Sequence, residues 1–233
     1  MAMYLQKSIV ETSLELPGWY GKLPTLGDFA SRRLAVGFIE TWDDWLAHGM
    51  AAWRAGAPGE WLDEYLAGPT WKFVLMPGVL PGPPGATAWA GVLMPSIDRV
   101  GRHFPFTVAQ PLPTLPDDGH DTETLLRWLH GLEDLAVDAL HDDWSVEQLE
   151  AALKAIGRWS AGPASHDNAD APGAGIDLST QARGRSLWLV AGADGRTELF
   201  AEAGLPAGPA FRRLLAGRPQ ARADLMSTSP GNP

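Results

Sequence analysis

Gly18-Trp19-Tyr20-Gly21-Lys22-Leu23-Pro24-Thr25-Leu26-Gly27-Asp28-Phe29 is the stretch around which the rest of the sequence is organised. Its glycines mark positions where a side chain would clash or where φ must be positive. Its large apolar residues predict core anchors around a strand, a turn and a second strand. Asp28, with Arg32 and Arg33 just beyond the stretch, is the polar remainder.

The apolar spacing that follows predicts an α/β protein. A stripe at intervals of three and four residues predicts a helix over 36–53, and the same periodicity recurs over 60–66, 123–140, 145–157 and 206–215. Apolar runs predict strands at 71–76, 86–94, 103–110, 186–191 and 197–201. We therefore expect a mixed, partly antiparallel central sheet with helices on both faces, a three-layer α/β/α sandwich.

The 233 residues are expected to form a single domain over 1–233. Its parts are a core at about 17–112, an acidic helical pair over 121–157, a surface loop over 160–175 rich in small and polar residues, and C-terminal strands and a helix over 186–215. The eleven tryptophans are expected mainly in the core, because a buried indole removes a large apolar surface from water.

The composition excludes several classes of site and of cellular location. The chain has no cysteine, which excludes disulfides, thiolate metal sites and a cysteine nucleophile. Residues 1–11 lack the pattern of a signal peptide, and no apolar run approaches the length of about 20 residues that spans a bilayer. We therefore expect a cytoplasmic protein without membrane insertion.

The negative charge is concentrated in one segment. Residues 117–150 hold eleven acidic side chains and a single basic one, Arg127, which together equal the net charge of −10. Nucleic acid is therefore not an expected partner, because phosphate binding requires a basic footprint. The acidic helices are interpreted either as a solvated face or as a docking surface for a basic partner.

The strongest candidate for a site is Ser96-Ile97-Asp98-Arg99-Val100-Gly101-Arg102. Two arginines offer forked donors suited to a phosphate or a carboxylate, so this segment is a candidate anion or phosphopeptide site. The alternative is structural: Asp98 pairs with an arginine and Ser96 caps the turn. In either case we expect this cluster to meet Asp28, Arg32 and Arg33 at one end of the sheet.

Motifs for catalysis are not found. Ser96 lacks the Gly-x-Ser-x-Gly turn of serine hydrolases, and the spacing of His103 carries no specific signal. The six histidines are scattered without metal-binding spacing, and no phosphate-cradling glycine loop is present. No enzyme activity, metal or cofactor is expected. An anion sensor and an enzyme of unrecognised type stay open as alternatives to a binding protein.

Three ordered blocks carry a family resemblance. They are the opening stretch with its two arginines, Trp42-Asp43-Asp44-Trp45-Leu46, and the run from Trp89 to Pro105 that contains the Ser96–Arg102 segment. Together they resemble the TagF (ImpM) family, accessory proteins of bacterial type VI secretion. The resemblance fades after about Leu112, so the core at about 17–112 is the part of the expected domain that matches the family.

The resemblance implies a post-translational repressor of type VI secretion that acts by binding. Its implied partner is the FHA-domain scaffold protein of the secretion apparatus. The residues to examine for a partner site or a fold-defining network are Asp28, Arg32, Arg33, Ser96, Asp98, Arg99 and Arg102. The sequence leaves the state of self-association open.

Overall fold

A computed structural model describes residues 16–162, 178, 181, 183–192 and 196–216. Its centre is a seven-stranded sheet with the order β2-β1-β5-β4-β3-β6-β7. The described strands are β1 (Gly18–Gly21), β2 (Ala30–Arg32), β3 (Trp71–Leu75), β4 (Ala88–Met94), β5 (Phe106–Leu112), β6 (Arg185–Ala191) and β7 (Thr197–Ala203). The described helices are α2 (Val36–Gly56), α3 (Trp61–Leu66), the short 3-10 helix η1 (Pro83–Ala86), α4 (Gly119–His141), α5 (Val146–Ile156) and α6 (Pro209–Leu215).

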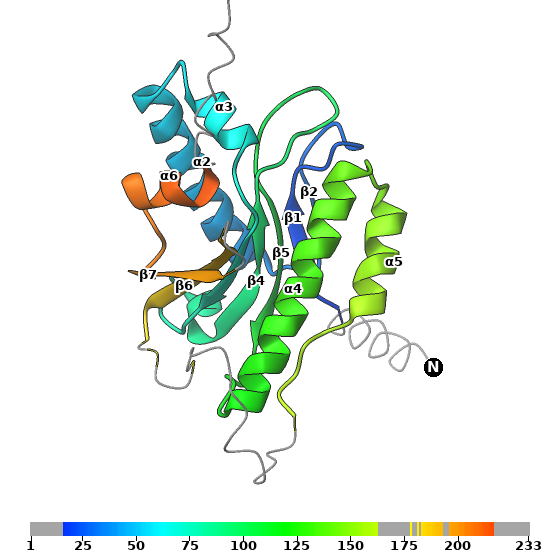
Figure 1. Cartoon of the computed structure of the whole chain (residues 1–233), viewed down its shortest axis with the longest axis vertical. Helices are drawn as coiled ribbons and strands as arrows, with labels where there is room; N and C mark the ends of the chain where they lie inside the picture. The colour runs from blue at the N-terminus through cyan, green and yellow to red at the C-terminus, as the bar shows by residue number, and fades with distance from the viewer. Residues whose placement is uncertain (1–15, 163–177, 179–180, 182, 193–195, 217–233) are drawn as a thin grey trace, which may run out of the picture.

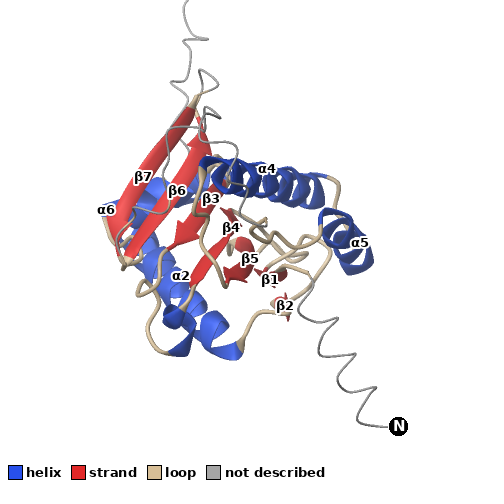
Figure 2. Cartoon of the chain, turned by 90° about the horizontal axis from the view of Figure 1, so that it is seen from below, coloured by secondary structure: helices blue, strands red, loops and turns tan. Residues whose placement is uncertain are grey.

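Helices cover both faces of the sheet, as expected. Helices α2, α3 and α6 lie on one face, and α4 and α5 lie on the other (Figures 1 and 2). The α/β fold with three layers is thus confirmed. The pairing goes beyond the expected partly antiparallel sheet, because all six pairs among the described strands are antiparallel.

The connections explain this pairing. Four pairs, β1–β2, β3–β4, β4–β5 and β6–β7, are each consecutive in the chain and adjacent in the sheet, as in hairpins. Helices α2 and α3 carry the chain over one face from β2 to β3. Helices α4 and α5 return it over the opposite face from β5 to β6.

The five inner strands of the sheet are buried on both sides, and alternate residues face alternate layers. Tyr20 and Phe73 pack in the core beneath α2, whereas their neighbours Trp19 and Val74 pack beneath α4 and α5. This is the period of two that strand geometry imposes. The continuous apolar runs of the sequence therefore belong to a sheet covered on both faces.

The tryptophans lie in or against the core, as predicted. Seven are buried, and the remaining four are partly buried. The predicted stripe of α2 is also confirmed, with five buried side chains facing the sheet: Phe38, Trp42, Leu46, Met50 and Trp53. The indole N–H of Trp42 donates to the Thr107 hydroxyl across 2.9 Å, so the buried ring also satisfies its polar atom.

Two boundaries differ from expectation. Helix α4 begins at Gly119 instead of Glu123, because Asp118, and not the expected Asp121-Thr122 pair, is its cap: the Asp118 carboxylate accepts the Asp121 N–H at 2.7 Å. The strand expected over 103–110 runs instead over Phe106–Leu112, starting after Pro105 and including Pro111. Pro111 is tolerated because β1 pairs with β5 only as far as Ala109.

Three further expectations concern the cap of α5, the loop over 160–175 and membrane-spanning segments. Ser145 caps α5 in a capping box with Gln148, as its position predicted. The loop expected over 160–175 falls outside the described residues except for 160–162. None of the described helices combines the length and the apolar character needed to cross a membrane.

Candidate functional site

Asp98 is the centre of the predicted polar cluster. Its carboxylate forms a buried ion pair with Lys22, whose side chain is 3% exposed while that of Asp98 is 0% exposed. Arg102 donates its Nε to the same carboxylate at 2.7 Å, and the backbone N–H groups of Val100 and Arg102 donate at 3.0 and 2.9 Å. The aspartate therefore holds strand β1 and the β4–β5 loop together.

These contacts decide the protonation state of Asp98. Burial alone would raise the pKa of this carboxyl, because it disfavours the charged form. The hydrogen bonds from Lys22, from the backbone and side chain of Arg102 and from the backbone of Val100 more than offset burial, so the pKa lies well below its usual range. Asp98 is thus a permanent anion at neutral pH.

Ser96 is likewise engaged within the fold. Its hydroxyl donates to the Lys22 carbonyl at 2.7 Å, and its backbone N–H donates to the Tyr65 hydroxyl at 2.8 Å. The Tyr65 hydroxyl in turn donates to the Ser96 carbonyl at 2.9 Å. Ser96 therefore ties the start of the loop to β1 and α3, and its hydroxyl is directed to a carbonyl rather than to His103.

The loop after β4 meets the loop after β1, as the sequence analysis expected. The Arg99 N–H donates to the Leu26 carbonyl at 2.9 Å, and Arg102 donates to the Gly27 carbonyl. Arg102 also lies 3.8 Å from the exposed carboxylate of Asp28. Asp28, Arg99 and Arg102 are thus brought together with Ser96 and Asp98.

Arg33 belongs to a different contact. It forms a forked pair with Glu150 of α5 at 2.6 and 2.9 Å, and the Trp19 indole donates to the same carboxylate at 2.7 Å. These hydrogen bonds outweigh the effect of burial and lower the pKa of Glu150. Arg32, the last residue of β2, is exposed and its charge also favours the Glu150 anion. The expectation that Arg32 and Arg33 join the Asp98 cluster is therefore wrong.

Sequence reasoning missed Lys22 and Glu150, the two charged partners that complete these contacts. Lys22 stood in the opening stretch, and a lysine among strand residues with apolar neighbours was a usable signal. Glu150 carried none, because its partner Arg33 lies 117 positions away in the sequence. Only the tertiary fold places them together.

A groove lies beside the Asp98 cluster. It has a volume of about 770 Å³ and runs between α2 on one side and the aromatic side chains of β1, Phe29 and the segment before β5 on the other. All three resemblance blocks contribute to its lining: Tyr20, Lys22 and Phe29 come from the first, Asp43 from the second, and Arg102, His103 and Phe104 from the third. We take this groove as the candidate functional site.

Polar groups are placed at separate points of the groove. The Tyr20 hydroxyl donates to the Asp43 carboxylate, and burial together with this bond raises the pKa of Tyr20. Arg54 lies over the Trp61 ring, 4.3 Å from its centroid, and donates to the His103 carbonyl at 3.1 Å. Partial burial and the nearby Arg54 charge lower the pKa of His103, which favours its neutral form.

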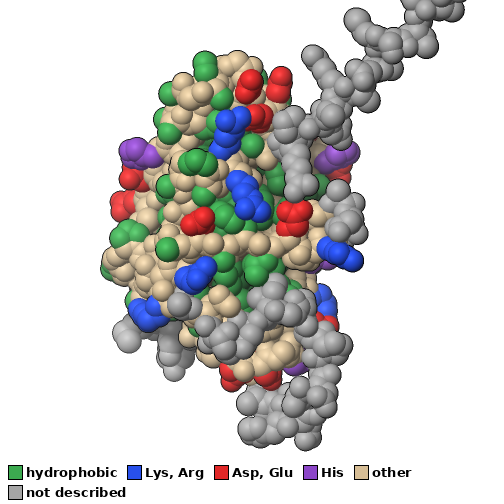
Figure 3. Space-filling model, turned by 60° about the vertical axis from the view of Figure 1, so that its left-hand side comes forward, with side chains coloured by type: hydrophobic (Ala, Val, Ile, Leu, Met, Phe, Trp, Pro, Cys, Tyr) green, Lys and Arg blue, Asp and Glu red, His purple; other side chains and the backbone are tan. Residues whose placement is uncertain are grey.

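A second groove of about 1000 Å³ lies on the other flank of α2, beside α6. Its rim carries Glu40, Asp43 and Asp44, and Trp45 and Phe211 contribute apolar surface. On the face that includes α2 and α6, hydrophobic side chains reach the surface between separate acidic and basic ones (Figure 3). Within the resemblance blocks only the second one, residues 42–46, contributes to this groove.

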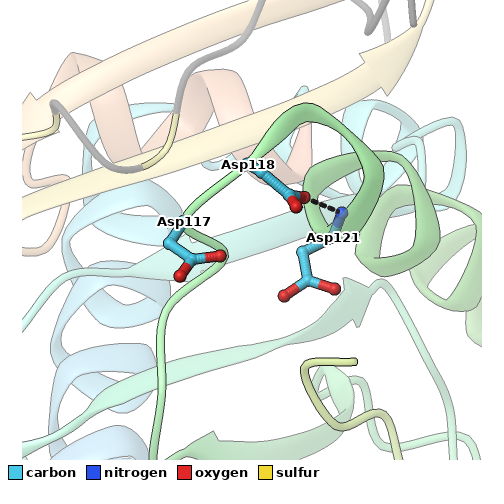
Figure 4. Close-up of side chains that lie close together, drawn as sticks. All are labelled: Asp117, Asp118 and Asp121. Atoms are coloured by element: carbon cyan, nitrogen blue, oxygen red, sulfur yellow. Dashed lines mark hydrogen bonds between the residues drawn. The ribbon is translucent and has the colours of Figure 1, made fainter. Parts of the chain in front are cut away.

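Three aspartates gather at the start of α4 (Figure 4). Carboxylate oxygens of Asp117, Asp118 and Asp121 lie within 4.8 Å of one another. Asp118 caps the helix, and Asp121 accepts the Gly162 N–H at 3.0 Å. The sequence analysis did not single out this Asp-Asp-x-x-Asp spacing. Asp118 thus stabilises the start of α4, and Asp121 stabilises the position of the Gly162 backbone.

Comparison with known proteins identifies the family of this chain. The family model described as the TagF N-terminal domain, type VI secretion system-associated, matches residues 18–156, which is more than half of the chain. The chain belongs to the TagF family. The match contains all three resemblance blocks and extends beyond Leu112, where the resemblance carried by those blocks ends.

A solved structure supports the same conclusion over a longer range. The crystal structure of PA0076 from Pseudomonas aeruginosa PAO1 is similar to this TagF protein, with a TM-score of 0.66 and 35% sequence identity. The similarity covers 93% of this chain and 100% of that chain. No curated protein matches the sequence.

Proposed function

We propose that this TagF protein is a non-enzymatic accessory regulator that represses type VI secretion in the cytoplasm by binding the FHA-domain scaffold protein of the apparatus. Family membership supports the association with type VI secretion. One observation carries the binding role: the three blocks that define the family resemblance, far apart in the sequence, line one groove. Residues needed only for the fold would not have to share an open surface.

The groove has the composition of a protein-binding surface. Aromatic residues and arginine are enriched where partners bury side chains. Phe29, Trp61 and Arg54 lie in this groove, and Phe29 remains 44% exposed although it is a large apolar side chain. A partner that covered Phe29 would remove that apolar surface from water.

The internal bonding of the cluster favours binding over catalysis. A nucleophile needs a base within hydrogen-bond reach, and the Ser96 hydroxyl is instead committed to a carbonyl. The ring of His103 packs edge-on against Trp61 and Tyr65, with centroids 5.8 Å apart in both cases. The residues first considered for chemistry thus stabilise the walls of the groove.

The anion-sensor alternative has less support. That alternative requires Arg99 and Arg102 to present free donors around Ser96. In the structure Ser96 and Asp98 are buried, and Arg102 is hydrogen-bonded to Asp98. An anion entering there would meet the Asp98 carboxylate. Arg102 still exposes 54% of its side chain, so phosphate binding to the purified protein is the direct measurement for this alternative.

A pull-down tests the proposed function. Purified TagF protein and the purified FHA-domain scaffold of the same secretion cluster are expected to form a complex, and extra copies of the TagF protein are expected to reduce secretion in cells. A variant with Asp134→Lys and Asp138→Lys, both exposed on α4, is the matched control. We expect it to bind like wild type, because α4 lies on the opposite face of the sheet from α2. Absence of a wild-type complex would contradict the proposal, and loss only in the α4 variant would move the site to the acidic helices.

A further inference from the structure

The walls of the groove have a regular spacing that points to the shape of its occupant. Asp43, Ala47, Met50, Ala51 and Arg54 of α2 all line it, at intervals of three and four residues that place them on one side of the helix. The groove therefore follows the helix axis. With a rise of about 1.5 Å per residue, Asp43 and Arg54 are about 16 Å apart along α2, the length of roughly five extended residues.

The two ends of this line carry opposite charges. At one end the Asp43 carboxylate accepts a hydrogen bond from Tyr20 and retains further acceptor capacity. At the other end Arg54 lies on Trp61 and donates to the His103 carbonyl, and it forms no ion pair with any residue in the described part of the chain. A partner can therefore meet a carboxylate at one end and a guanidinium with unused donors at the other.

Between these ends the α2 wall of the groove is apolar. Ala47 and Ala51 are exposed and present only methyl groups, so the helix leaves room above them. The opposite wall presents the rings of Tyr20, Phe29 and Phe104, with the Phe29 and Phe104 centroids 4.8 Å apart. Lys22 and Arg102 also line this wall, and both are paired with Asp98. A single branched or aromatic side chain of a partner would be covered by both walls.

We propose that the groove binds an extended peptide segment of the partner protein, about five residues long, with a basic side chain at Asp43, an apolar side chain between Phe29 and the Ala47–Ala51 surface, and an acidic side chain at Arg54. This inference rests on the proposed function and specifies its contact surface. Opposite charges at the two ends set the orientation and reject segments of uniform charge, since like charges brought together weaken binding.

Synthetic peptides test the proposal directly. Two fluorescent probes contain Lys-Ser-Leu-Ser-Glu, in which Lys, Leu and Glu share one side of an extended chain, and its reverse order, because either chain direction satisfies the groove. A third probe has Lys in place of Glu, and a fourth has Gln at both ends. We expect the better Lys/Glu probe to bind at least about fivefold more tightly than the other two, which corresponds to about 1 kcal/mol. Amide NMR shifts are expected at Ala47 and Ala51.

A charge exchange makes the test specific. Arg54→Glu is expected to invert the preference, so that the Lys/Lys probe binds better than the Lys/Glu probe. Arg127→Glu, an exposed arginine on α4, is the matched control and is expected to keep the wild-type preference. Arg54 packs on Trp61, so Arg54→Glu could also displace that ring, and a second variant is needed. Ala51→Trp fills the groove from an exposed helix position and is expected to weaken binding of the Lys/Glu probe at least about tenfold.

The outcomes separate this inference from the proposed function. Equal binding of all probes would overturn the assignment of the groove. So would an unchanged probe preference in Arg54→Glu together with an unchanged affinity for the Lys/Glu probe in Ala51→Trp. If those variants still form the complex with the full scaffold, the accessory role stands and only the groove assignment fails. If wild type forms no complex but shows the charge-dependent preference for the probes, the groove assignment stands and the scaffold is the wrong partner.

Discussion

At Gly21 the backbone leaves no room for a side chain. Its φ is +130°, and an added Cβ would lie 2.2 Å from the Pro105 carbonyl oxygen. Gly21→Ala therefore combines an unfavourable backbone conformation with a steric overlap at the β1–β5 pairing. We expect it to lower the free energy of unfolding by about 2–4 kcal/mol, measured by urea denaturation.

Gly27 provides the matched control for this substitution. There an added Cβ would come no closer than 3.5 Å, to the end of the Arg99 side chain. Gly27→Ala is expected to change the stability by less than about 0.5 kcal/mol. Equal losses at the two positions would contradict the argument. The sequence marked both glycines alike, since spacing does not reveal which backbone segment passes close by.

Asp98 is expected to govern part of the acid sensitivity of the protein. Its pKa is lowered in the folded state, so it stabilises the fold fully above its unfolded pKa of about 3.9. That contribution is lost as the pH falls from this value toward the folded pKa. We expect Asp98→Asn to be less stable at neutral pH and to show a shallower loss of stability below about pH 4.

Thermal denaturation between pH 7 and pH 2.5 measures this effect. Asp28→Asn is the control, because Asp28 is exposed and lies 3.8 Å from Arg102. Its stability curve is expected to follow that of wild type. An Asp98→Asn protein with the wild-type acid slope would show that other carboxyls, such as Glu64 and Glu150 with their own lowered pKa values, dominate the response.

At the scale of elements, a single carboxylate fastens α5 to the edge of the sheet. Glu150 accepts from both Arg33 and Trp19. A double-mutant cycle with Arg33→Ala and Glu150→Ala is expected to give a coupling energy of about 0.5–1.5 kcal/mol, kept modest because the pair is partly exposed to solvent. Urea denaturation of the four proteins measures it. A coupling near zero would mean that apolar packing alone holds α5 in place.

The sequence predicted helices and strands well where the apolar spacing is periodic. It predicted their ends and their polar contacts less well, because hydrogen bonds and ion pairs determine these. The stripe of α2 placed Phe38, Trp42 and Trp53 in the core correctly. The start of α4 was wrong, because Asp118 outcompetes the Asp121-Thr122 pair as the cap. The proximity of Arg102 to Asp28 at one end of the sheet was expected. The Arg33–Glu150 pair was not, because local patterns carry no information about contacts between distant segments.

For the whole molecule, charge and fold are linked. Three of the acidic side chains that make residues 117–150 so negative are engaged within the fold: Asp121 is buried and accepts the Gly162 N–H, Glu133 pairs with the buried Lys72 of β3, and Glu150 pairs with Arg33. The segment is therefore more than a solvated surface. A net charge count cannot separate the carboxylates that hold α4 and α5 to the sheet from those that face water.

The family match ends at residue 156, but the core does not. Trp188 of β6 lies 5.4 Å from Phe73 between ring centroids, and Phe211 of α6 packs closely on Gly49 of α2. A fragment of residues 16–162 would lose these rings together with Leu214 and Leu215, each contributing about 1.5–3 kcal/mol by burial. Their sum approaches the total stability of about 5–15 kcal/mol of an ordinary domain, so we expect the fragment not to fold cooperatively, whereas residues 16–216 should. Circular dichroism with thermal denaturation compares the two, and a cooperative transition of the short fragment near that of the long one would show that β6, β7 and α6 are dispensable additions.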